Sequence, residues 1–316
     1  MTAPPTVEEI TARAASTGSD DIVIVRGGCS LLNRSFSNCR RAVYIASVGK
    51  PLVSCAIGRA VALGALQSVD EPVASFFPEW RQGRKRLITI RHILTHRSGI
   101  QNVADASIEL EPAPDIVRLA LAAELTEIPG EKMRYNNKAV AILGGIIERA
   151  TGCRFDVFVE QELFTPMEIK EFDWVRDATG TPTTYGAFVL RADDLVKFGQ
   201  LILDNGRFGG TQLLNPKWVA ESLAPSSRDH PELGWLWYRL TEVGSQQTGQ
   251  SAQFVAYYHV GFRGNYLVAI PDQEIVAARL ISREGFARGG DVYSSFIEDI
   301  CRLANPQLGE LQIPVA

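Results

Sequence analysis

Cysteine is scarce in this 316-residue chain, and long apolar runs are absent. The cysteines are odd in number and form no C-x-x-C pair, so we expect reduced, mostly buried and inert thiols and no disulfide framework. They are Cys29, Cys39, Cys55, Cys153 and Cys301. No apolar run reaches the roughly 18 residues of a membrane span, since Arg59 interrupts the longest candidate. Residues 1–9 lack the basic and apolar regions of a secretory signal, so we expect a soluble, cytoplasmic protein.

An excess of charge of one sign is also missing, because 32 Lys and Arg face 36 Asp and Glu. The basic stretch at residues 81–86 has no interleaved aromatic side chains to stack on bases. No group of His, Cys, Asp and Glu has metal-ligand spacing. We therefore expect a small-molecule substrate, with no nucleic-acid or membrane partner, no metal and no organic cofactor.

Apolar periodicity and capping residues predict the secondary structure. The expected helices are 7–15 capped by Thr6, the helix that starts near Ser47 and ends at Gly64, 71–77 capped by Asp70, 90–95 capped by Thr89, 138–151 closed by Gly152, and 291–303. The expected strands are 21–25, 30–33, 254–260, 264–270 and 274–281, the last three as an antiparallel meander.

Strands at both ends of the chain around a helical middle predict an α+β fold. We expect an antiparallel β-sheet flanked by N- and C-terminal helices, with an inserted all-helical lobe, in a single catalytic domain. The sheet lobe is placed at residues 1–51 plus about 175–316, and the helical lobe at about 52–174.

The tetrad Ser47-Val48-Gly49-Lys50 carries the strongest chemical signal. A serine and a lysine three positions apart at the start of a helix lie on one face, so the amine can reach the hydroxyl. A serine hydroxyl attacks a carbonyl only when a neighbouring base removes its proton, and lysine suits that task if burial lowers its pKa. Pro51 requires the helix to begin close to Ser47. By itself the pattern is short enough to arise by chance.

A second group precedes the helix expected at residue 138. In an extended segment, Tyr135 and Asn137 would point the same way and could both face a cleft. A phenol near a lysine can exist partly as phenolate, and an asparagine offers a donor and an acceptor to a substrate amide or ester. In the alternative interpretation, Tyr135 packs in the core and Asn137 caps the next helix.

A third group lies at the edge of the meander. Gly261 permits close approach of a ligand and leaves the Phe262 N–H free to point into a site. His259 stands two residues before this glycine, where a structural role is the alternative. Aromatic side chains of this region could line an acyl pocket, although sheet core is an equal alternative for the tryptophans; they are Trp235, Trp237, Tyr257, Tyr258 and Phe262.

The three groups in this order resemble the penicillin-recognising serine hydrolases, especially the class C β-lactamase-like group with its family VIII carboxylesterases, D-aminopeptidases and DD-peptidases. Ser47 to Lys50 corresponds to S-x-x-K, Tyr135 to Asn137 to Y-x-N, and His259 to Gly261 to the H-x-G that replaces K-T-G in some relatives. Leu94-Thr95-His96-Arg97-Ser98-Gly99 is similar to the family's L-T-H-x-S-G turn, which we take as structural. The likeness extends over about residues 20–300.

The resemblance implies a role for each group. Ser47 would be the nucleophile, Lys50 and Tyr135 would share the removal and return of its proton, and an acyl-enzyme would form and then hydrolyse. The backbone N–H groups of Ser47 and Phe262 would donate to the oxyanion. Asn137, His259 and Gly261 would bind and orient the substrate.

The histidine in the third motif bears on the substrate. A neutral His259 would not supply the cation that binds the carboxylate of penicillins, so we expect a serine carboxylesterase acting on small esters, with amides as a further substrate class. A β-lactamase, a D-aminopeptidase or DD-peptidase, and an acyltransferase are alternatives on the same residues. A non-catalytic relative that keeps the fold is a further alternative.

Overall fold

The computed structural model of this protein describes residues 3–37, 41–186, 188–243, 253–308, 311 and 313. Cys39, one of the predicted free thiols, lies outside the described residues. Among those that are described, no helix is long and apolar enough to cross a membrane. The four described cysteines are free; Cys55 and Cys301 are buried as expected, whereas Cys29 is exposed.

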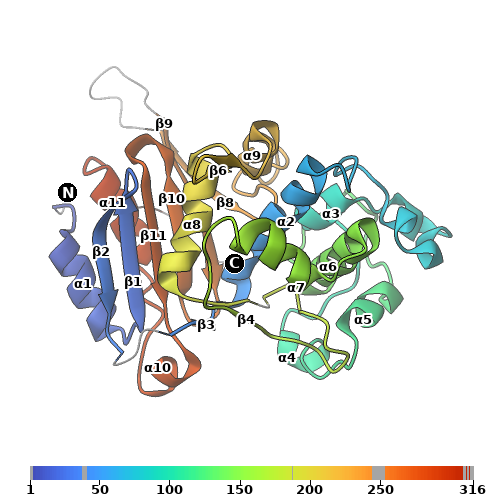
Figure 1. Ribbon diagram of the computed structural model, residues 1–316, viewed down its shortest axis with the longest axis horizontal. Coiled ribbons are helices and arrows are strands. Elements are labelled where there is room, and N and C mark those ends of the chain that lie inside the picture. The colour runs from blue at the N-terminus through green and yellow to red at the C-terminus, as the bar shows by residue number, and fades with distance from the viewer. Residues whose placement is uncertain are drawn as a thin grey trace.

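A six-stranded antiparallel sheet takes strands from both ends of the chain (Figure 1). Its order is β2-β1-β11-β10-β9-β8, with bounds Cys29–Ser35, Asp21–Arg26, Ile275–Leu280, Asn265–Ile270, Gln253–Gly261 and Tyr238–Val243. The expected meander is therefore correct, and so is the fold class. The pairing of β1 with β11 brings strands from the two ends of the chain into one sheet.

Helices bury both faces of this sheet. Alternate residues along a strand point to opposite faces, and in the buried strands β1, β10 and β11 both sets are largely apolar. In β10, Leu267 belongs to one core cluster and Val268 to the other. Helices α1 (Val7–Ser16) and α11 (Phe296–Ala304) cover one face, and α8 (Ala192–Leu203) covers the other.

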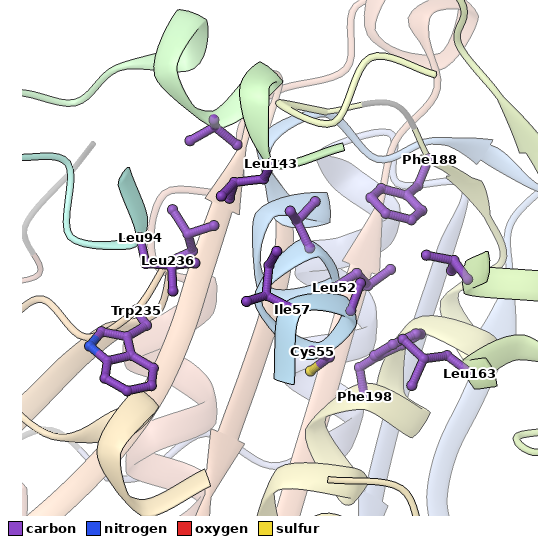
Figure 2. Close-up of a cluster of buried hydrophobic side chains, with 14 of the residues drawn as sticks. Leu52, Cys55, Ile57, Leu94, Leu143, Leu163, Phe188, Phe198, Trp235 and Leu236 are labelled. Carbon is purple, nitrogen blue, oxygen red and sulfur yellow. The ribbon is translucent and has the colours of Figure 1, made fainter. Parts of the chain in front are cut away.

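Helix α2 (Lys50–Ala62) lies at the centre of the molecule (Figure 1). It is apolar nearly all round, which is typical of a helix enclosed by other elements. Leu52 packs towards Phe188 and Phe198, and Ile57 lies on the side of Leu94 and Leu236 (Figure 2). Pro51 stands in its first turn, where a missing N–H costs nothing, and a short 3₁₀ turn, Ala46–Gly49, leads into it.

Most of the remaining helices and short strands come between α2 and β8 along the chain. The other helices are α3 (Ile90–Leu94), α4 (Ala106–Glu109), α5 (Ile116–Ala122), α6 (Asn137–Thr151), α7 (Phe155–Val159), α9 (Pro216–Leu223) and α10 (Arg283–Ala287). The short strands are β3 (Val43–Tyr44), β4 (Asp173–Trp174), β5 (Phe188–Leu190), β6 (Arg207–Phe208) and β7 (Thr211–Gln212). The lobe limits at residues 51 and about 175 remain predictions.

Local capping rules predicted several helix ends correctly. Thr6 and Thr89 accept backbone N–H bonds at the starts of α1 and α3, and Gly152 ends α6 in the left-handed region. The helix expected over 71–77 was wrong: Pro72 is extended and only the 3₁₀ turn Val73–Ser75 follows. Asp70 pairs instead with Arg91 at 2.6 Å.

The last helix begins later than expected, at Phe296 and not at residue 291. Tyr293 has a φ of 49°, in the left-handed region, so the chain turns sharply before α11. Periodicity alone extended the helix through this turn, because the apolar pattern continues upstream of it.

Gly199 tests the contact of α8 with the sheet. A Cβ at this position would lie 2.4 Å from Val276 Cγ1, closer than two carbons can approach. Although alanine favours a helix by up to about 1 kcal/mol, overpacking costs about 1–3 kcal/mol. We therefore expect Gly199→Ala to lower the free energy of unfolding in urea. In a Val276→Ala background, which removes the clashing methyls, the same change should be neutral or stabilising; additive effects would contradict the contact.

Candidate active site

Glycines let the chain pack closely around Ser47. A Cβ on Gly261 would lie 2.5 Å from the Ile45 carbonyl oxygen, and one on Gly49 would lie 2.6 Å from the Phe188 ring. Ala46, directly before Ser47, has a φ of 54°. A left-handed non-glycine residue costs about 1 kcal/mol or more, and it persists only where the surroundings impose it. Ser47 is thus held on a strained, enclosed turn, while its side chain stays partly exposed.

Three predicted residues converge at the start of α2. Lys50 Nζ donates to Ser47 Oγ at 2.9 Å, and Tyr135 OH donates to the same oxygen at 2.9 Å. Lys50 also donates to the Tyr185 carbonyl oxygen at 2.7 Å, and its Nζ lies 4.8 Å from the centre of the Tyr135 ring. The amine, the phenol and the alcohol therefore share one site, as the sequence predicted.

Burial sets the protonation states of this group. Lys50 is fully buried, and desolvation holds the pKa of its amine well below the ordinary 10.5. Desolvation also raises the pKa of Tyr135 above its ordinary 10.0, more than the Ser47 hydrogen bond lowers it. The partial phenolate considered from the sequence is thus disfavoured. A neutral amine has a lone pair for the Ser47 proton, and a neutral phenol keeps a proton to donate.

His96 positions Tyr135. Its ring centre lies 4.7 Å from that of Tyr135, and its Nδ1 accepts the Asn136 backbone N–H at 3.2 Å. Burial lowers the His96 pKa to about 3, so the ring is neutral and can accept this bond. Ser98 accepts the Ile100 N–H. The turn is structural, as expected, but its contact with Tyr135 could not be inferred from sequence spacing.

Two adjacent asparagines have different surroundings. Asn136 caps α6: its side chain accepts the Ala139 N–H at 2.8 Å and donates to the Ile100 carbonyl at 2.7 Å. Asn137, which the alternative interpretation made the cap, is the first residue of the helix. Its Oδ1 is buried and has no hydrogen-bond partner among the described residues. A buried unpaired acceptor at a cavity wall is a site for a ligand donor.

The third motif supplies part of the cavity wall but no positively charged side chain. His259 is 1% exposed, its Nδ1 lies 2.9 Å from the Val260 carbonyl oxygen, and burial lowers its pKa well below 6.5. His259 is not among the residues of the cavity wall, and its burial argues against direct contact with a substrate. Gly261 and Phe262 are at the cavity wall, and Phe262 is 69% exposed.

A buried arginine holds the turn that follows Phe262. The Arg279 guanidinium is fully buried and donates to the carbonyls of Arg263 and Gly264 at 3.2 and 2.6 Å. It also donates to the carbonyls of Thr17 and Asp291 at 3.1 and 2.7 Å. One side chain therefore ties the β9–β10 turn to two other loops. Nothing in the sequence motifs pointed to this residue.

Ser47 opens into a cavity of about 610 Å³, a volume suited to a small organic molecule. Its wall is formed by Ser47, Ala104, Tyr135, Asn137, Val260, Gly261, Phe262, Arg263, Gly264, Tyr266, Val292, Ser294, Ile297, Glu298, Leu311 and Ile313. The described residues contain no group of three or more His, Cys, Asp or Glu that could hold a metal ion.

Of the five aromatic residues suggested as lining, Phe262 alone lies on this wall. Trp235, Trp237 and Tyr258 are core residues, at most 3% exposed, and Tyr257 lines a different cavity. The alternative of sheet core was correct for the tryptophans. The other apolar residues of the wall include Val260, Tyr266, Ile297, Leu311 and Ile313, and nothing in the sequence motifs pointed to the last two.

Comparisons with known proteins identify the fold and the family. Esterase EstB from Burkholderia gladioli is 32% identical over 151 residues, which are 42% of this chain and 38% of EstB, so the match spans less than two thirds of that relative. The penicillin-binding protein homologue from Pyrococcus abyssi has a TM-score of 0.73 at 18% identity, over 94% of this chain and 76% of that one.

A second solved structure shares the fold over almost its full length. EstCE1, described as a hydrolase with promiscuous acyltransferase activity, has a TM-score of 0.73 at 17% identity, over 93% of this chain and 97% of that one. The family model described as beta-lactamase matches residues 22–300. Since that match covers most of the chain, this protein belongs to the beta-lactamase family, whose fold is that of the serine β-lactamase-like hydrolases.

Proposed function

We propose that this protein is a serine hydrolase that works through an acyl-enzyme on Ser47, with small carboxylic esters as its substrates. The observation that carries the proposal is the position of Ser47 Oγ, 2.9 Å from both the Lys50 amine and the Tyr135 hydroxyl. A hydroxyl within hydrogen-bond reach of a base and an acid, beside an open cavity, is the arrangement that nucleophilic catalysis needs.

The mechanism uses the protonation states described above. The neutral Lys50 amine takes the Ser47 proton as Oγ attacks the acyl carbonyl. The backbone N–H groups of Ser47 and Phe262 donate to the oxyanion. Tyr135 donates its proton to the leaving alcohol and is reprotonated from Lys50. Water then attacks the acyl-enzyme by the same route in reverse, which restores Ser47.

Esters are preferred to lactams for two reasons. His259 is buried and neutral, so it supplies no cation for a substrate carboxylate. The second reason is that Esterase EstB is 32% identical over 151 residues, a higher identity than that of either solved structure. Transfer of the acyl group to an alcohol in place of water is a related reaction, in line with the description of EstCE1.

One observation favours a second candidate, a β-lactamase or D-aminopeptidase. Arg263 lies on the cavity wall with its guanidinium 4.7 Å from the centre of the Phe262 ring, and none of the described carboxylates pairs with it. It could bind a substrate carboxylate in place of the missing lysine. Turnover of nitrocefin that falls at least tenfold in Arg263→Gln, with ester hydrolysis unchanged, would favour this candidate.

Ser47→Ala tests the nucleophile. We expect kcat/KM for p-nitrophenyl acetate and butyrate to fall at least about 1000-fold, because the attacking oxygen is removed. Ser54→Ala is the matched control: Ser54 lies in the same helix, is 1% exposed and has no partner for its hydroxyl among the described residues. It should keep wild-type rates. Intact-mass analysis should detect an acyl adduct on wild-type protein and on Ser54→Ala, and equal rates for Ser47→Ala and wild type would refute the assignment.

The pH profile tests the roles of Lys50 and Tyr135. Only the neutral amine accepts a proton, and the pKa of Lys50 is lowered well below 10.5. We therefore expect kcat/KM to rise with pH as Lys50 loses its proton, at a pH well below 10.5. The pKa of Tyr135 is raised, so the fall in kcat/KM caused by loss of its proton should come above pH 10.0. Tyr135→Phe should lower kcat and keep the acidic limb. A rate that still climbs through pH 10 would contradict a neutral Lys50.

The adjacent asparagines provide a paired test of structure against function. Asn136→Ala removes the α6 cap and should lower the free energy of unfolding by about 1–2 kcal/mol. Asn137→Ala removes an unpaired oxygen, so it should change stability by less than about 0.5 kcal/mol and lower kcat/KM for esters about tenfold or more. Urea denaturation and steady-state kinetics measure both effects. Equal losses of unfolding free energy in the two variants would contradict an unpaired Asn137 side chain at the cavity wall.

A further inference from the structure

The wall of the cavity beside Ser47 combines the proposed reacting groups with apolar side chains. The reacting groups are Ser47 and Tyr135, with Asn137 beside them. The apolar side chains come from β9, β10, α11 and the two described residues beyond 308; they are Val260, Tyr266, Ile297, Leu311 and Ile313. The Tyr266 hydroxyl already donates its proton to the Val292 carbonyl at 2.9 Å, so it offers a ligand no donor.

Residues 311 and 313 are anchored to the core. After α11 ends at Ala304, Asn305 accepts backbone N–H bonds from Gln307 and Leu308 at 3.1 Å each, which turns the chain back. Leu308 and Leu311 are 7% and 8% exposed and join the apolar cluster under α1 and α11. Ile313 packs against the same cluster. The wall they form is therefore built on the core.

The position of the proton donor indicates where the acyl chain of a substrate would lie. In the proposed mechanism the leaving alcohol must lie beside Tyr135, which comes from the segment before α6. The apolar wall comes from the sheet, α11 and the chain beyond it. An ester with its alcohol at Tyr135 would extend its acyl chain towards that wall. Charged side chains at the cavity are Arg263 and Glu298, and Glu298 lies 3.8 Å from Arg302.

We propose that Leu311 and Ile313 form the far wall of an acyl subsite, and that they select esters of unbranched, uncharged, medium-length fatty acids. This inference rests on the proposed esterase function. Each methylene buried against the wall should raise kcat/KM about three- to fourfold, as expected for transfer of a CH₂ group out of water. The rise should end where the chain reaches Leu311 and Ile313.

The experiment compares p-nitrophenyl acetate, butyrate, hexanoate, octanoate and decanoate. Wild-type protein should show a rise of about three- to fourfold per methylene from acetate to at least hexanoate. The double variant Leu311→Ala/Ile313→Ala should keep its acetate rate within about twofold and lose about tenfold or more on the best long ester. The unchanged acetate rate shows that the variant is folded.

Two further variants keep the test specific. Leu308→Ala is the matched control, because Leu308 is buried in the same cluster but is not on the cavity wall; it should keep the wild-type chain-length profile. Ile313→Trp adds volume to the wall and should shift the optimum to a shorter chain. A wild-type optimum at acetate, an unchanged profile in the double variant, or equal flattening in Leu308→Ala would each overturn the inference. If wild type is no faster than Ser47→Ala on acetate, the esterase function itself has failed.

Discussion

The structure depends on one buried amine. Lys50 has no contact with solvent, and its nitrogen reaches Ser47 and the Tyr185 carbonyl. Burying a charged ammonium in such a place is costly, so the group is held neutral. That state requires α2 to be enclosed on all sides, by the sheet and α8 on one side and by α6 on the other. The same enclosure that gives the helix its core position lowers the pKa of Lys50, which is what the proposed role as a base requires.

The groups around this amine are held by residues that take no part in the chemistry. His96 supports Tyr135, Arg279 ties the turn after Phe262 to two loops, and close glycine contacts hold the strained Ala46. Such support matters because acyl transfer is sensitive to small errors in geometry. The positioning residues come from separate parts of the chain, so the site is a product of the whole fold.

The cavity wall is assembled from distant parts of the chain. Tyr135 and Asn137 come from the start of α6 and the segment before it. The strands β9 and β10 with the turn between them, α11, and residues 311 and 313 supply the residues from Val260 to Gly264, Tyr266, Ile297, Leu311 and Ile313. In the proposed mechanism, both parts of the chain take part in the reaction, and the apolar side chains of the second part contact the acyl chain.

The meeting of Ser47 with Tyr135, 88 residues away, was implied only by the family resemblance. Local sequence was sufficient for five of the six strands of the central sheet, for helices α1, α2, α3 and α6, and for the contact of Ser47 with Lys50, because period, caps and motif spacing depend on residues close in the chain. It failed at residues 71–77, where Pro72 and the Asp70–Arg91 pair replace a helix, and at the start of α11. Only the tertiary structure decided that Asn136 is the cap, that His259 is buried, and that residues 311 and 313 reach the cavity. These outcomes depend on contacts between distant segments, and those contacts set burial, which local patterns do not contain.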